Sequence, residues 1–204
     1  MTTETTMGAH AVAIFGPEHT GTKALLNLLI DGFGAAGKRG NCGHGKLWDF
    51  EPLYAFKYSI PSGHTTMGPW PEPKKILQDI LFANYEKVTV LVPIRNNWCV
   101  RESHLRDSCV VTHESKEIKY RRNPKTLEKI VESAYATIIN DCQSLGIPFY
   151  FVSYEDMVSN TRRFLYGLSH MIGEPVTSER VGIFDANKKY DTLLPKNKLT
   201  NKEK

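Results

Sequence analysis

The chain is poor in cysteine, and the few cysteines it has are scattered. Its four cysteines, at positions 42, 99, 109 and 142 of 204 residues, form no C-x-x-C pair. This spacing argues against a disulfide framework and against a cysteine zinc site. We therefore expect free thiols in a reducing compartment.

Long hydrophobic runs and a strong charge of one sign are also missing. No window approaches the roughly 18 apolar residues of a membrane span, and the polar start, residues 1–10, lacks a basic segment followed by an apolar one. The net charge of +4, from 26 basic and 22 acidic side chains, is too small to indicate nucleic-acid binding but suits a small anionic ligand. We expect a cytoplasmic protein with no membrane or nucleic-acid partner; the sequence indicates no oligomeric state.

What is present is the composition of a globular domain. Apolar residues make up 41% of the chain and charged residues 24%. The length fits one domain, predicted over residues 1–194, and the polar residues 195–204 are expected to be a disordered tail.

Apolar runs of strand length alternate with segments of helical periodicity. Strands are predicted at 11–15, 54–60, 87–94 and 149–153. Helices are predicted from 22 to about 32 or 34, and at 74–83, 97–108, 125–145 and 161–172. This alternation predicts an α/β fold, a three-layer sandwich with a central parallel sheet of the P-loop nucleotide-binding type. In such folds, ligands bind at the carboxyl ends of the strands.

The segment after the first strand has the glycine spacing of a phosphate-binding loop. It reads Gly16-Pro-Glu-His19-Thr20-Gly21-Thr22-Lys23. Glycine lets the backbone curl around an anion, and the N–H groups of the following helix point at it. An ATP-using P-loop places Lys directly after the second glycine and Ser or Thr next, whereas here Thr22 precedes Lys23. A tight turn without a ligand is the structural alternative.

The segment with Thr before Lys resembles the 5′-phosphosulfate loop of sulfotransferases. It is particularly similar to the loop of heparan-type sulfotransferases, in which the sequence Gly-Thr-Arg-Ala-Leu-Leu is common. Thr20, Gly21, Thr22, Lys23 and Ala24-Leu25 match that pattern. The resemblance implies that Gly16 and residues 20–23 bind the cofactor 3′-phosphoadenosine 5′-phosphosulfate (PAPS), with no metal required. His19 stands where the family usually has Lys.

A second match follows the third strand. A kinase commonly has a magnesium-binding Asp at the end of a buried strand, but this chain has Arg95 there, a cation that can bind a phosphate but not a metal. Eight residues on, Ser103 lies on the next predicted helix. Sulfotransferases carry the same Arg-x7-Ser pair for the 3′-phosphate of PAPS, so the resemblance makes Arg95 and Ser103 cofactor-binding residues. The alternative is an Arg that caps a helix or pairs with Glu102.

A third match, residues 152–158, is similar to the family's Tyr-Glu-Asp-Leu segment. We expect Glu155 and Asp156 to fix the turn between the last strand and its helix. The competing interpretation makes one of them a metal-binding acid in a kinase. The three matches together span residues 11–175, in the order found in the family.

Candidate catalytic residues come from the resemblance and from proton chemistry. Lys57-Tyr-Ser59-Ile-Pro61 is similar to a Lys-Thr-His-Leu-Pro stretch in which the His is the general base, but Ser59 takes its place here. His64 is the candidate replacement base, with a solvated loop histidine as the alternative. His19 and Lys23 are the candidates for stabilising the leaving phosphate. If His19 acts as the imidazolium, activity falls as it loses its proton.

Other residues carry weaker signals. Cys42 and His44 provide too few ligands for a metal site. Trp48 and Trp70 are candidates for an acceptor pocket or for core packing. Lys188 and Lys189 are candidates for a 3′-phosphate contact or for a solvated pair.

The sequence therefore predicts a sulfotransferase that moves a sulfonate group from PAPS to a hydroxyl or amine of a carbohydrate or other small-molecule acceptor. The alternatives are a P-loop kinase for a nucleotide or modified nucleoside, and a nucleotide-binding protein without catalysis. The segments expected to contact the acceptor, residues 34–50, 62–73 and 109–123, carry no motif.

Overall fold

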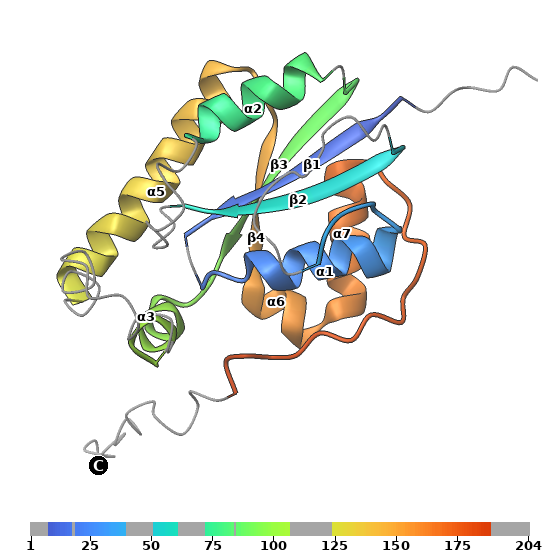
Figure 1. The fold of residues 1–204 in the computed structure, drawn as a ribbon. Helices are drawn as coiled ribbons and strands as arrows, with labels where there is room; N and C mark the ends of the chain where they lie inside the picture. The colour runs from blue at the N-terminus through green and yellow to red at the C-terminus, as the bar shows by residue number, and fades with distance from the viewer. Residues whose placement is uncertain are drawn as a thin grey trace, which may run out of the picture.

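Four parallel strands form the centre of the protein in the computed structural model (Figure 1). The structure describes residues 8–17, 19–39, 51–60, 72–83, 85–106 and 124–188. The strands are β1 (His10–Gly16), β2 (Leu53–Ser59), β3 (Lys87–Ile94) and β4 (Phe149–Ser153), in the spatial order β2-β1-β3-β4. The predicted α/β class with a central parallel sheet is confirmed.

Helices cover both faces of the sheet (Figure 1). One face packs against α2 (Pro73–Phe82) and α5 (Pro124–Ser144). The other packs against α1 (Thr22–Phe33), α6 (Tyr154–Ser159) and α7 (Thr161–Ile172). Helix α3 (Asn97–Arg106) lies beyond the carboxyl ends of the strands.

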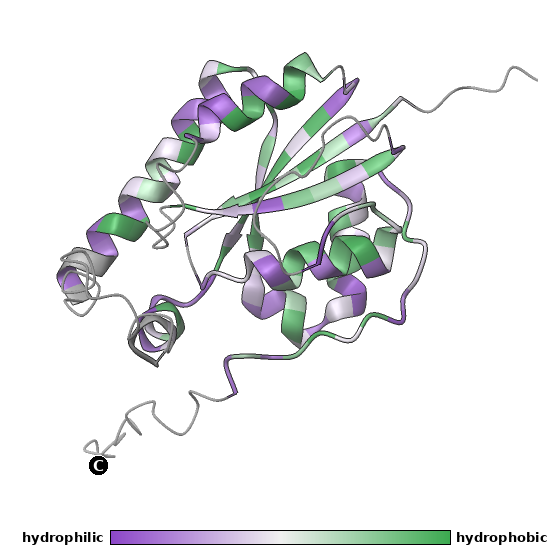
Figure 2. Ribbon diagram, in the orientation of Figure 1, coloured by the Kyte–Doolittle hydropathy of each residue, from purple (hydrophilic) through white to green (hydrophobic). Residues whose placement is uncertain are grey.

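Burial of both faces explains the apolar strands. In β1, Ala11, Ala13 and Phe15 belong to the core on the α2 and α5 side, whereas Val12 and Ile14 belong to the core on the α1 side. Successive side chains of a strand point to opposite faces, so a strand covered twice has to be apolar throughout. Figure 2 shows the predominantly hydrophobic central strands.

The strand order gives the sheet one topological switch point. From β1 the chain crosses to β2 on one side, and from β3 it crosses to β4 on the other. The carboxyl ends of β1 and β3 are therefore the topological switch point, where open α/β sheets bind ligands.

Pro93 ends the backbone hydrogen bonding between β1 and β3 at this switch point. Val90 N donates to Pro148 O on the β4 side, so the N–H groups at positions 91 and 93 face β1, because sides alternate along a strand. Pro93 has no N–H to donate. The β1–β3 register accordingly stops at Ile14↔Leu91, while β3 pairs with β4 as far as Ile94↔Ser153.

The helix boundaries follow from local chemistry. Helix α1 ends at Gly34 and α7 at Gly173, both left-handed, as the sequence predicts for glycine C-caps. Helix α2 begins at Pro73, which is favoured in the first turn because its missing N–H is not needed there. The short helix α6 was expected only as a turn; Ser153 caps it by accepting from Asp156 N at 3.1 Å.

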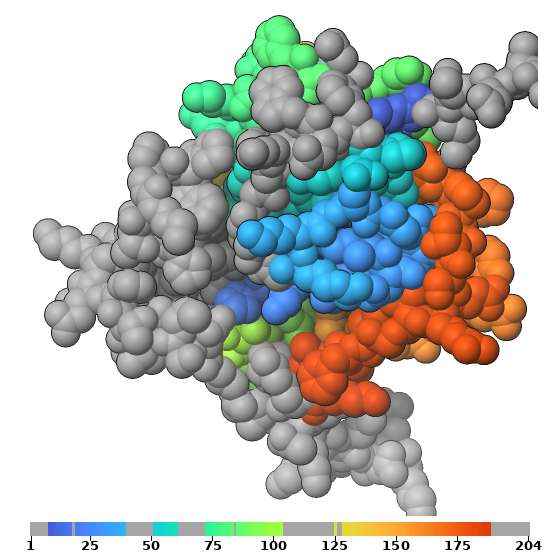
Figure 3. Space-filling model, turned by 45° about the vertical axis from the view of Figure 1, so that its right-hand side comes forward, coloured from blue at the N-terminus to red at the C-terminus, as the bar shows by residue number. Residues whose placement is uncertain are grey.

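Residues 174–188, named the C-terminal strap here, run from α7 along α1 toward α3 (Figures 1 and 3). The N–H groups of Thr177 and Ser178 both donate to the carbonyl of Gly32 in α1, at 2.7 and 3.1 Å. Val181 and Ile183 pack against the α1-side core. Backbone hydrogen bonds to α1 and apolar contacts with the α1-side core thus hold the strap in place.

The beginning of the strap is held by a buried histidine. His10, 1% exposed at the start of β1, hydrogen-bonds Glu174 through Nδ1 at 2.6 Å and Thr89 through Nε2 at 3.0 Å. Lys87 donates to the carbonyl of Ile172, the last residue of α7. Burial, opposed by Glu174 and assisted by Lys87, lowers the pKa of His10 below its usual value.

This pKa predicts acid sensitivity of the fold. Below the ordinary histidine pKa of about 6.5, the unfolded chain takes a proton that folded His10 resists, so the free energy of unfolding falls as pH drops. The slope from this one group is at most about 1.4 kcal/mol per pH unit. Urea unfolding of wild type and His10→Gln between pH 7.5 and 5.5 measures it, and the variant should show the shallower dependence. An equal change in slope for His170→Gln, which removes an exposed histidine, would contradict this assignment.

In the described ranges, no helix is both long and apolar enough to cross a membrane. Burial, and then the nearby Asp141 carboxylate, raise the pKa of the Cys142 thiol to about 12, so that thiol stays protonated and unreactive. Cys42, Cys109 and the predicted tail at 195–204 lie outside the described residues.

Candidate functional site

The loop between β1 and α1 has two residues with positive φ at the switch point. His19 has φ 65° and Gly21 has φ 102°. Thr20, between them, is buried and donates from Oγ1 to the carbonyl of Pro17 at 2.7 Å. Positive φ is uncommon for a non-glycine residue, so His19 is held in place by its surroundings.

The two glycines of the loop permit close approach of other elements. A Cβ on Gly16 would lie 2.8 Å from Thr20 Oγ1 and 3.2 Å from Pro93 Cγ. A Cβ on Gly21 would lie 2.4 Å from Cδ2 of Tyr154. The loop is therefore packed against the ends of β3 and β4 at both of its predicted glycines.

The N-terminus of α1 faces this loop. Its N-cap residue is Gly21, which has no side chain to accept from the first N–H groups of the helix. Thr22, the first helical residue, is buried. Such N–H groups, together with the helix dipole, attract an anion.

Arg95 leaves β3 and lies beneath the loop, 9% exposed. Its Nη1 donates to the backbone carbonyl of His19 at 2.8 Å, and its Nε donates to Oδ1 of Asn187 at 2.7 Å. The guanidinium also lies over the ring of Tyr154, 4.6 Å from the centroid. These contacts fix a positive charge next to the α1 N-terminus.

Ser103, on α3, also reaches the loop. Its hydroxyl hydrogen-bonds Nδ1 of His19 at 2.9 Å. Arg95 and Ser103, eight residues apart in the chain, thus converge on one residue, His19. The structure brings together seven of the predicted residues here: Gly16, His19, Thr20, Gly21, Thr22, Arg95 and Ser103.

The remaining predicted residues are placed less centrally. Lys57 is 5% exposed, two residues before the end of β2 and beside Ile14 of β1. Lys23 is exposed in the first turn of α1 and Lys188 is exposed at the end of the strap. His64, Trp48, Trp70, Lys189 and the segments expected to contact the acceptor, apart from residues 34–39 and 72–73, lie outside the described residues.

Three residues of the site were not predicted to act there: Tyr154, Glu155 and Asn187. Glu155 Oε1 accepts from Asn96 N at 3.0 Å and from Asn187 Nδ2 at 3.1 Å. Glu155 thus links the end of β3 to the strap, a contact other than the strand-to-helix turn that we expected it to fix. Asn187 has no sequence signal, because its partners are 92 and 32 residues away.

Burial shapes the acidity of two tyrosines that contact residues of this region, Tyr154 and Tyr135. It raises the pKa of Tyr154, with backbone N–H of Ala186 and the Arg95 charge acting in the opposite direction. Burial, and then the Glu155 carboxylate, raise the pKa of Tyr135 to about 12. The Tyr135 hydroxyl donates to Pro93 O at 3.1 Å. Both phenols therefore stay protonated near neutral pH.

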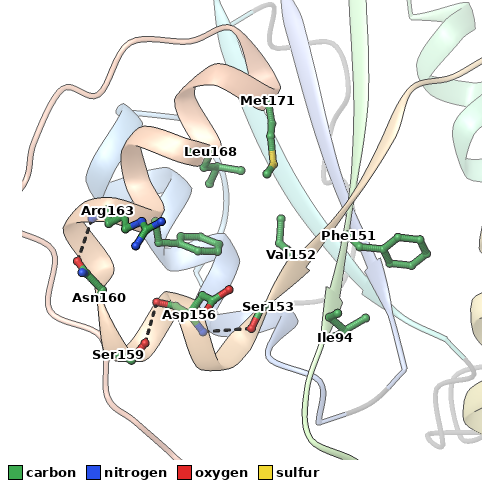
Figure 4. Close-up of a pocket in the computed structure, with 12 residues that line it drawn as sticks. Ile94, Phe151, Val152, Ser153, Asp156, Ser159, Asn160, Arg163, Leu168 and Met171 are labelled. Atoms are coloured by element: carbon green, nitrogen blue, oxygen red, sulfur yellow. Dashed lines mark hydrogen bonds between the residues drawn. The ribbon is translucent and has the colours of Figure 1, made fainter.

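A separate groove of about 720 Å³ lies at the β4 edge of the sheet (Figure 4). Its apolar wall comes from β3, β4 and α7, and its charged side chains are Asp156 and Arg163. Its lining includes no histidine, cysteine or lysine, and none of the seven residues gathered at the loop. Within the described ranges, no three His, Cys, Asp or Glu side chains lie where they could hold one metal ion.

Comparison with known proteins gives similarity in structure but none in sequence. No family model matches the chain, and no curated protein matches its sequence. Among solved structures, the chain is similar to a sulfotransferase from Alicyclobacillus acidocaldarius, with a TM-score of 0.40 and 11% identity over 89% of this chain and 90% of that one. A similarity this distant assigns no function, which has to be inferred from the residues of this chain.

Proposed function

We propose that the protein is a PAPS-dependent sulfotransferase acting on a hydroxyl or amine of a sugar or small metabolite. One observation carries the proposal: Arg95 and Ser103 converge on His19, in the glycine loop at the switch point. A cation and a hydroxyl donor beside an uncapped helix N-terminus suit a ligand with more than one phosphate-like group.

The chemistry of this cluster fits PAPS better than ATP with magnesium. A kinase needs an acid to hold its metal, whereas the residue that follows β3 is Arg95. Glu155, the acid of this network, already accepts from Asn96 N and Asn187 Nδ2. In this proposal the N–H groups at the start of α1 bind the 5′-phosphosulfate, and Arg95 and Ser103 bind the 3′-phosphate.

Sulfonate transfer requires one bond exchange and one proton acceptor. The bond between sulfur and the bridging oxygen breaks, the acceptor oxygen or nitrogen bonds to sulfur, and 3′,5′-adenosine bisphosphate leaves with the electron pair. The acceptor proton passes to a base, for which His64 is the candidate. His19 and Lys23 are the candidates for stabilising charge on the leaving phosphate.

A binding comparison tests the proposal. We expect 3′,5′-adenosine bisphosphate in EDTA to raise the melting temperature, and ATP with magnesium to have little effect. At about 100 times the dissociation constant, the bisphosphate adds roughly 2.7 kcal/mol to the free energy of unfolding. Ser103→Ala should weaken bisphosphate binding several-fold, while Ser144→Ala, at the exposed end of α5, should leave it unchanged.

Two outcomes would overturn this assignment. Stabilisation by ATP and magnesium alone would make the protein a P-loop kinase. Bisphosphate binding without transfer from PAPS across a panel of sugars, phenols and amines would make it a nucleotide-binding protein without catalysis.

A further inference from the structure

Asn187 makes a two-sided contact at the end of the C-terminal strap. Its amide oxygen accepts from Arg95 Nε at 2.7 Å, and its amide nitrogen donates to Glu155 Oε1 at 3.1 Å. The amide thus presents an acceptor to a cation and a donor to a carboxylate. An aspartate here would set a second carboxylate against Glu155, and a leucine would supply neither group.

Tyr154 makes a second link between the strap and Arg95. The Tyr154 hydroxyl accepts from Ala186 N at 2.9 Å and donates to Phe184 O at 3.4 Å. The ring of the same tyrosine lies under the Arg95 guanidinium. Tyr154 therefore fixes the strap residues directly before Asn187 and supports the face of the cation.

These contacts determine which edge of the guanidinium faces the loop. The guanidinium is planar, with donors in a fixed fork. The Tyr154 ring lies against the guanidinium, 4.6 Å from its central carbon, and the hydrogen bond from Nε to Asn187 limits how far the fork can turn. Nη1 is thereby aimed at His19 in the loop, 2.8 Å from its carbonyl oxygen.

We propose that Asn187 is a positioning residue for Arg95, and that the strap is therefore part of the anion site. This inference rests on the proposed function, because the anion is taken to be 3′,5′-adenosine bisphosphate or PAPS. Asn187 acts through Arg95 and need not touch the ligand. Its removal leaves the positive charge in place but lets the fork turn away from its binding geometry.

A double-mutant cycle tests this role. Bisphosphate affinity is measured by calorimetry, at a temperature where circular dichroism shows every variant folded, for wild type, Asn187→Leu, Arg95→Lys and the double variant. We expect Asn187→Leu to weaken binding about tenfold in the wild-type background. In the Arg95→Lys background, which has no fork to orient, it should weaken binding less than threefold.

Ile183→Ala is the matched control. It loosens the packing of the strap on the α1-side core, and the apolar side chain that it shortens carries no hydrogen-bonding group. Its bisphosphate affinity should stay within twofold of wild type. An equally large loss for Ile183→Ala would show that general loosening of the strap, and not orientation of Arg95, weakens binding.

Different results would overturn the role of Asn187 and the proposed function. Wild-type affinity in Asn187→Leu, or the same tenfold loss in both backgrounds of the cycle, overturns the positioning role and leaves the sulfotransferase proposal standing. Failure of wild type itself to bind the bisphosphate overturns the proposed function, and the anion-binding role of Asn187 with it.

Discussion

Replacing Gly21 with alanine should destabilise the protein by on the order of 3 kcal/mol, through backbone strain and a steric clash. A side chain at φ 102° is strained, and the new Cβ would lie 2.4 Å from the Tyr154 ring. For a chain of this length the melting temperature should fall by roughly 10 °C. Because Tyr154 also supports Arg95, bisphosphate binding should weaken too. Urea unfolding and calorimetry measure the two effects.

Gly146→Ala is the control for the backbone contribution. Gly146 also has a positive φ, 65°, but a Cβ there would meet no atom within 4 Å. Its replacement should cost only about 1 kcal/mol, the strain of a left-handed residue. Equal losses for the two variants would contradict the close approach of Tyr154 to the loop.

Replacing Arg95 with methionine should have the largest effect on ligand binding. Methionine keeps apolar contact with Tyr154 but leaves the His19 carbonyl and Asn187 Oδ1 without their charged donor. We expect at least a 100-fold loss of bisphosphate affinity, so that stabilisation by the ligand falls from roughly 2.7 to about 0.4 kcal/mol at the same concentration. The ligand-free protein should lose on the order of 3 kcal/mol of stability.

Arg163→Met controls for the loss of one positive charge. Arg163 is exposed in α7 and lines the β4-edge groove. Its replacement should leave bisphosphate affinity unchanged. If Arg95→Met does not fold, Arg95→Lys keeps the charge without the fork, and wild-type affinity in that variant would contradict the role given to Arg95.

The regular elements could be predicted because their signals are local. The apolar run of β3 and the helix α7 ending before Gly173 have the predicted bounds. The helix α6 was missed although it has a local signal, since Ser153 is followed by Asp156 in capping position. A six-residue helix is easily taken for a turn when the expected feature is a strand-to-helix connection.

The site could be predicted only in part, because some of its contacts depend on how distant segments are placed in the fold. Residues that follow strands meet at one edge of a parallel sheet, so the proximity of the Gly16–Gly21 loop to Arg95 follows from strand order. The direct contact of Ser103 with His19 does not, since it depends on the position of α3. The contribution of Asn187 depends on the path of the strap, which has no periodicity to reveal it.

Pro93 has a consequence for ligand binding at the switch point. Since it has no N–H on the β1 side, β3 offers β1 no further backbone donor there, whether or not a ligand is present. That missing donor is fixed by the covalent structure of proline. An anion bound at this position therefore displaces no hydrogen bond between β1 and β3.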